Sequence, residues 1–233
     1  MHSILSRALR PLAVVVLAAS ATLAPAMAAD ATLKPFNADY VANYMGMEAS
    51  ARMSLAQAGA QWKYTLSIKS SLASLSQSTT FDEQGGQWRP LSGTDNASVI
   101  IKKVNKQATY DWAHGVATWT GDVKPDRAGP VKLQAGDLDA MLVNLAIARD
   151  VAAGKPLKYR MVDEGRAKDL VYTVSGKEQI TFAGKAHQAT KVSRTDGNKQ
   201  TVLWVVDGLP APARILQRKD GQDEMDLKLQ AMH

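Results

Sequence analysis

The sequence has 233 residues, a formal net charge of +6 at pH 7 and no cysteine. The lack of cysteine excludes disulfides and a thiol nucleophile, so stability must come from a hydrophobic core. The basic pairs Lys102-Lys103 and Arg218-Lys219 are short and are typical of solvated faces, so we expect no nucleic acid partner.

The first residues have the pattern of a secretory signal peptide. Arg7 and Arg10 precede an apolar run of about a dozen residues, and Ala26-Met27-Ala28 supplies the small residues that a signal peptidase recognises. A buried N-terminal helix is the alternative. We expect residues 1–28 to be cleaved off near Ala28, and residues 29–233 to form one exported domain without a transmembrane segment.

Residues 36–70 alternate apolar and polar side chains three times, which is typical of three strands with one dry and one wet face. Turns are predicted around Gly46 and Gly59. Because successive side chains of a strand alternate sides, the dry face should carry Tyr40, Met53, Tyr64 and Leu66, and the wet face Asp39, Arg52, Lys63 and Thr65.

A weaker strand is predicted over 75–81, followed by a turn at Gly85-Gly86 and one or two strands from Ser98. The stretch 110–119 favours a hairpin, with Tyr110 and Trp112 on a common face. A loop with Pro and Gly punctuation follows over 121–130.

The apolar period then changes to three and four, which predicts one helix near 137–153. Asp137 is the predicted N-cap, and Gly154 is the predicted residue after the helix. Asn144 and Arg149 are expected to face solvent. The predicted apolar stripe consists of Leu138, Met141, Leu142, Leu145 and Ala148.

The period returns to two after the helix, with turns predicted around 164–168, 184–185, 195–198 and 219–221. We count roughly ten to twelve strands in total. Consecutive short strands joined by turns indicate an all-β, mainly antiparallel fold, whose sheet must curl into a barrel-like or prism-like shape.

The residue types that commonly serve in catalysis are scattered along the sequence. His114, His187 and His233 form no metal-binding or catalytic spacing, and no nucleophile motif is present. The acidic groups fit structural roles, in a helix start, a turn and a solvated edge: Asp137 with Asp139, Asp163 with Glu164, and Asp223 with Glu224 and Asp226. We therefore expect no catalytic residue, no metal and no cofactor, and a protein that is not an enzyme.

Five tryptophans lie at or near predicted strands, and they could pack in the core or line a space for an apolar ligand. They are Trp62, Trp88, Trp112, Trp119 and Trp204. If the curled sheet leaves a cavity, its predicted lining is Tyr40, Met53, Tyr64, Leu66, Tyr110, Trp112, Met141, Leu142 and Leu145.

Several short motifs resemble a known family when they are taken in order. They are F-x-A-x-Y (36–40), T-Y-D-W (109–112), D-x-x-A-M-L (137–142), K-Y-R-M-V-D-E-G (158–165), A-x-K-V (189–192), L-W-V (203–205) and L-P-A-P-A-R-I (209–215). The chain thereby resembles the exported bacterial proteins of domain-of-unknown-function family 3108. The resemblance implies an all-β fold and the periplasm of Gram-negative bacteria. The closing motif and its hairpin are also similar to the lipoprotein carriers of the Lol system, whose curved sheet shelters acyl chains.

Two functions stay open from the sequence. The first is a periplasmic, non-enzymatic protein that binds an apolar ligand or envelope component, such as a lipid, an acyl chain or a lipoprotein, inside the curled sheet. The second is an interaction or structural protein with a filled core, which contacts another envelope protein through its rim or an edge strand.

Overall fold

The computed structural model describes residues 33–44, 46–99 and 102–233, so the predicted signal peptide, residues 1–28, lies outside the described residues. The helices are η1 (Pro125–Arg127) and α1 (Ala140–Ala152). The strands are β1 (Phe36–Tyr44), β2 (Met47–Ala58), β3 (Gln61–Lys69), β4 (Ala73–Gln84), β5 (Gln87–Val99), β6 (Lys102–Asp111), β7 (Val116–Gly121), β8 (Val131–Lys132), β9 (Lys158–Asp163), β10 (Arg166–Val171), β11 (Thr173–Phe182), β12 (Lys185–Asp196), β13 (Lys199–Val206), β14 (Arg214–Lys219) and β15 (Gln222–Met232).

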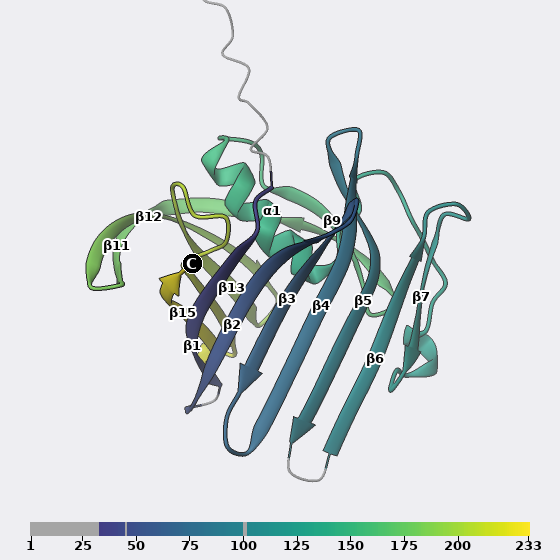
Figure 1. The fold of residues 1–233 in the computed structure, drawn as a ribbon, viewed down its shortest axis with the longest axis horizontal. Helices are drawn as coiled ribbons and strands as arrows, with labels where there is room; N and C mark the ends of the chain where they lie inside the picture. Colours follow the sequence, from purple (N-terminus) through teal and green to yellow (C-terminus); the bar gives the residue numbers. More distant parts are fainter. Residues whose placement is uncertain (1–32, 45, 100–101) are drawn as a thin grey trace, which may run out of the picture.

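Thirteen strands form one antiparallel sheet, in the order β11-β12-β13-β14-β15-β1-β2-β3-β4-β5-β6-β7-β8. Strand β1 pairs with both β2 and β15, so the two ends of the domain are joined inside the sheet. Figure 1 shows this sheet curving around α1. The mainly antiparallel β fold with one α-helix is confirmed.

The sheet is open within the described residues, because its outermost strands β11 and β8 do not pair with each other. The barrel-like or prism-like shape that the sequence predicts is therefore not confirmed. The predicted number of strands was also too low. The prediction did not include the two-residue strand β8, and it placed no strand between the Gly85-Gly86 turn and Ser98, where β5 begins at Gln87. Pro90 and Gly93 hide the alternating pattern of β5, and pairing with β4 and β6 stabilises it instead.

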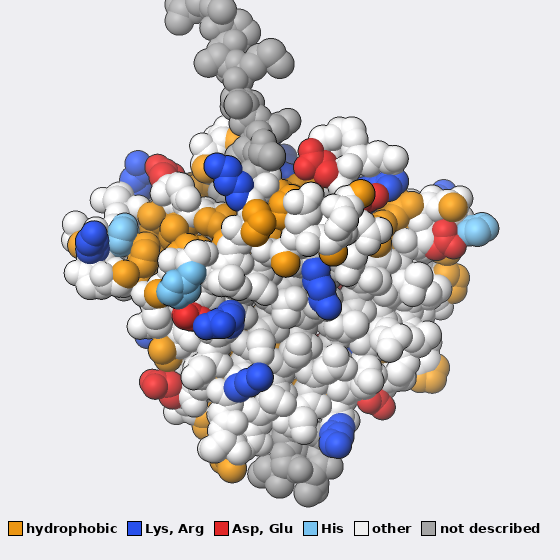
Figure 2. All heavy atoms as spheres, in the orientation of Figure 1, with side chains coloured by type: hydrophobic (Ala, Val, Ile, Leu, Met, Phe, Trp, Pro, Cys, Tyr) orange, Lys and Arg blue, Asp and Glu red, His pale blue; other side chains and the backbone are white. Residues whose placement is uncertain are grey.

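The two faces of β1–β3 are those that the alternation predicts. Tyr40, Met53, Tyr64 and Leu66 are buried, whereas Arg52 and Lys63 are exposed. Asp39 lies on the wet face and accepts a hydrogen bond from Arg52 Nε at 2.7 Å. Figure 2 shows the molecule in the same orientation, with charged side chains scattered over this face and hydrophobic side chains gathered across its upper part.

Helix α1 starts later than predicted. Its N-cap is Asp139 rather than Asp137. The chain is still extended at Leu138, which forms a parallel bridge with Met161 of the separate β9–β10 hairpin. Gly154, with φ of 62°, follows the C-cap residue Ala153, as predicted.

The face of α1 that was predicted to see solvent is only partly exposed, at Asn144 and Arg149, because the curved sheet and the β9–β10 hairpin cover most of the helix. Leu142, Leu145 and Ile147 are almost completely buried. Arg149 is only partly exposed, and its guanidinium lies 4.2 Å from the ring centre of Trp88. Among the described residues, no helix is both long enough and apolar enough to cross a membrane.

Candidate functional site

A cavity of about 280 Å³ lies between the concave face of the sheet and α1. Small residues on the inner face make room for it. Gly93 of β5 pairs in register with Ala108 of β6 on one side and with Thr79 of β4 on the other. A Cβ atom added at Gly93 would lie 3.4 Å from the Cβ of Ala108. A larger side chain at either position would therefore extend into the cavity.

One part of the cavity is an apolar wall. It is formed by side chains from β2, β3, β14 and β15, namely Met53, Tyr64, Leu66, Ile215 and Leu227. The hydroxyl of Tyr64 donates a hydrogen bond to the sulfur of Met53 at 3.2 Å. Both side chains are almost fully buried. Methionine adapts its shape readily, so this wall can adjust to an apolar guest.

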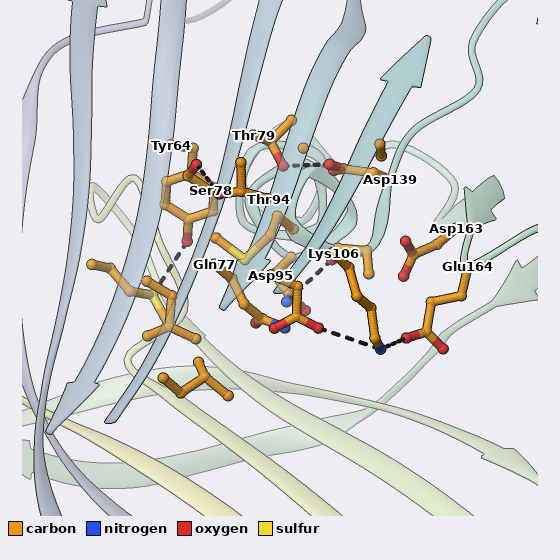
Figure 3. A pocket seen from close by; sticks show the side chains of 18 of the residues that line it. Tyr64, Gln77, Ser78, Thr79, Thr94, Asp95, Lys106, Asp139, Asp163 and Glu164 are labelled. Carbon is orange, nitrogen blue, oxygen red and sulfur yellow. Dashed lines mark hydrogen bonds and ion pairs between the residues drawn. The ribbon is translucent and has the colours of Figure 1, made fainter. Parts of the chain in front are cut away.

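The other part is a polar end, defined by Asp95, Lys106, Asp139, Asp163 and Glu164 (Figure 3). Lys106 of β6 lies between two acids: its Nζ is 2.5 Å from Glu164 Oε1 and 3.7 Å from Asp95 Oδ2. The hydrogen bond with Glu164 raises the pKa of Lys106, so this side chain stays charged. Figure 3 places this group on the opposite side of the cavity from Tyr64.

Asp139 connects the polar end to the helix. Its Oδ1 accepts a hydrogen bond from the backbone N–H of Leu142 at 2.8 Å, which caps α1, and its Oδ2 accepts a short hydrogen bond from Thr79 Oγ1. The residue is only 5% exposed. Burial raises the pKa of Asp139 from 3.8 to about 6, although these hydrogen bonds act in the opposite direction.

Asp163 lies at the end of β9 and is partly exposed. Burial, and next the negative charge of Asp139 and Glu164, raise the pKa of Asp163 to about 7. Both acids therefore change charge between weakly acidic and neutral pH. Within the described residues, no ion pair joins Asp139 or Asp163 to a lysine or arginine.

The structure brings together five of the nine predicted lining residues around the cavity: Met53, Tyr64, Leu66, Tyr110 and Met141. The other four lie elsewhere. Leu142 and Leu145 belong to the closed core, and Tyr40 donates a hydrogen bond from its hydroxyl to the carbonyl of Pro212 at 2.8 Å. Trp112 packs at the edge of a second core cluster and donates from Nε1 to the carbonyl of Pro90. Whether any of the nine binds a ligand stays a prediction.

Sequence reasoning missed the polar end. It assigned Asp139 to the helix start, where it is the N-cap, and Asp163 with Glu164 to a turn, in which Glu164 follows Asp163, the last residue of β9. The signal that could have found the site is polar residues on an inner strand face. Lys106 shares its face with Ala108 and Tyr110, which are both buried. A polar residue at such a position needs a hydrogen-bond or charge partner, either within the protein or on a bound ligand.

The arrangement can hold an elongated molecule with an apolar part and a polar part. The described residues contain no group of three or more His, Cys, Asp or Glu side chains placed to hold a metal ion. The polar groups around the cavity are instead joined to one another: Thr79 to Asp139, and Lys106 to Glu164.

Fold and site together define an open, curled antiparallel sheet around one helix, with a cavity of mixed polarity on the concave side. The chain belongs to the family described as "Protein of unknown function (DUF3108)", whose model matches residues 39–228. No curated protein matches the chain. Among solved structures, the chain is similar to the crystal structure of MucB, with 10% sequence identity and a TM-score of 0.31. The match covers 85% of this chain and 52% of that chain, so this chain spans about half of it.

Proposed function

We propose that this protein is a periplasmic, non-enzymatic binding protein that shelters an acyl chain or another apolar part of an envelope component in its curled sheet. The observation that carries the proposal is the apolar wall, because a well-packed core would leave no comparable space behind Met53, Tyr64 and Leu66. Pockets for small ligands typically combine such a wall with a few polar groups, which is the composition seen here.

A binding role rather than a catalytic one is supported by the partners of the polar groups. Thr79 donates its hydroxyl hydrogen to Asp139, and Lys106 is paired with Glu164. Both pairs have a structural explanation: Asp139 also accepts the N–H of Leu142 at the start of α1, and the hydrogen bond with Glu164 keeps Lys106 protonated, so that its amine is not a nucleophile. The proposed location in the periplasm rests on the signal peptide pattern of residues 1–28.

The direct test is to purify the protein from its native periplasm, extract it with organic solvent and identify bound molecules by mass spectrometry. Recovery of a stoichiometric apolar molecule is the expected result. Met225→Trp should reduce the recovery, because Met225 lines the cavity and is partly exposed, so a larger side chain there can enter the space. Val171→Trp is the matched control, because Val171 is 52% exposed, does not line the cavity and lies at the end of the β9–β10 hairpin away from Asp163. Equal recovery from both variants would contradict binding in this cavity.

A second function is favoured by one separate observation, the edge strand β11. This strand ends the sheet, and most of its side chains are exposed, including Val174 at 61%. An exposed edge can accept a strand from another protein. Val174→Lys and Lys177→Pro should abolish such pairing and leave the cavity unchanged. Loss of a partner together with retained ligand would assign the interaction to this edge.

A further inference from the structure

We infer that the cavity selects an amphiphile whose polar group is a cationic amine, and that it rejects phosphate and carboxylate head groups. This inference rests on the proposed function and specifies its ligand. It follows from the charge of the polar end, whose lining contains four carboxyl groups, Asp95, Asp139, Asp163 and Glu164, and one lysine, Lys106. The remaining titratable groups of the lining are Tyr64 and Tyr110, which are buried phenols.

Lys106 is not free to bind an anion. Its ammonium group already contacts Glu164 and Asp95, and it is only 24% exposed. An anionic head group that approached Lys106 would have to displace one of these acids and would then lie beside the others. Like charges at such distances repel, and the surrounding protein screens them less than water does.

An ammonium group meets the opposite situation. Within the described residues, Asp163 forms no ion pair, and it lies next to Glu164 at the polar end (Figure 3). Burial and the neighbouring acids raise the pKa of Asp163, as expected where negative charges outnumber positive ones. A bound cation would relieve this repulsion and would hold Asp163 and Asp139 in their charged forms.

The volume of the cavity suggests the size of a suitable test ligand. A volume of about 280 Å³ corresponds to roughly nine times the volume that one water molecule occupies in the liquid, about 30 Å³. That space suits a chain of about eight carbons with a small head group. The apolar wall would contact the chain, and the polar end would contact the amine.

The test compares three ligands of equal length at pH 8: octylammonium, octanol and octanoate. Binding is measured by calorimetry and by tryptophan fluorescence, because Trp119 lines the cavity. We expect octylammonium to bind at least tenfold more tightly than octanoate, with octanol between them. If none of the three binds, the proposed function fails. If octanol binds but octanoate equals or exceeds octylammonium, only the present inference is overturned.

Two variants test the polar end. Asp163→Asn should reduce the preference for octylammonium over octanol, and Glu164→Gln should shift selectivity toward octanoate because it frees Lys106. Glu164 is about half exposed, so its replacement should leave the fold intact, and circular dichroism verifies this for both variants. Asp126→Asn is the matched control, because the carboxyl group of Asp126 is 67% exposed. Unchanged selectivity in both folded variants would overturn the inference.

Discussion

Replacing Asp139 with Asn removes a buried charge and keeps the helix cap. The amide oxygen of Asn can accept the hydrogen bond from Leu142 N, and Asn is as good an N-cap as Asp. The amide NH₂ would then face Thr79, whose hydroxyl can accept as well as donate. The substitution therefore isolates the effect of the charge on stability.

The magnitude follows from the pKa of Asp139, which burial raises from 3.8 to about 6. Each unit of pKa difference between folded and unfolded states corresponds to 1.36 kcal/mol, so the charged carboxylate lowers stability by about 3 kcal/mol. The sign is fixed by the order of ionisation. As pH rises above 3.8, the unfolded chain loses this proton first, so the wild-type protein becomes less stable until the pH passes the folded pKa of about 6.

Urea unfolding at pH 4, 6 and 8, followed by tryptophan fluorescence, measures the effect. The stability of Asp139→Asn relative to the wild type should rise by about 2 kcal/mol or slightly more from pH 4 to pH 8, because at pH 4 the unfolded carboxyl is already partly ionised. Removal of the Asp139 charge also lowers the pKa of Asp163, which adds a contribution of the same sign. Asp126→Asn should show no such rise. A difference between Asp139→Asn and the wild type that stays constant across this range would refute the burial of the charge.

Three further outcomes are expected. Leu142→Asp should lower stability by several kcal/mol, because Leu142 has no exposed surface and a carboxylate there would lack a partner; an unchanged melting temperature would contradict its burial. Met53→Ala should cost about 2 kcal/mol, near the lower limit for such changes because Met53 already borders a cavity, whereas Leu203→Ala in the closed core should cost more in the same urea titration. N-terminal sequencing of protein from the periplasm should begin near Ala29 or Asp30, and an intact Met1 would exclude cleavage.

The faces of the first three strands could be predicted because a period of two determines which side chains share a side. Met53, Tyr64 and Leu66 therefore all reach the interior, as expected. The helix was predictable from its spacing, but its first residue was not, because the bridge between Leu138 and Met161 is a contact between segments distant in sequence. Local pattern carries no information on such a contact.

The polar end could not be assembled from the sequence for the same reason. Lys106, Asp139 and Asp163 come from three different elements, and only the curvature of the sheet around α1 brings them to one cavity. Curvature depends on the twist of all thirteen strands and on bulges such as the register shift between Thr80 and Phe81. A residue-by-residue pattern predicts the inner face but not the shape of the space that it encloses.

The choice between a filled core and a cavity has different answers at different places in the molecule. Around the body of α1, the core contains large side chains such as Leu145 of the helix and Leu203 of β13, and both are almost completely buried. Beside the first turn of the helix, the inner face carries Gly93 and Ala108, and the space that they leave is the cavity. The closed part supplies stability, which allows the adjacent part to remain unfilled. A ligand could therefore enter and leave this space without the domain unfolding, which a binding protein requires.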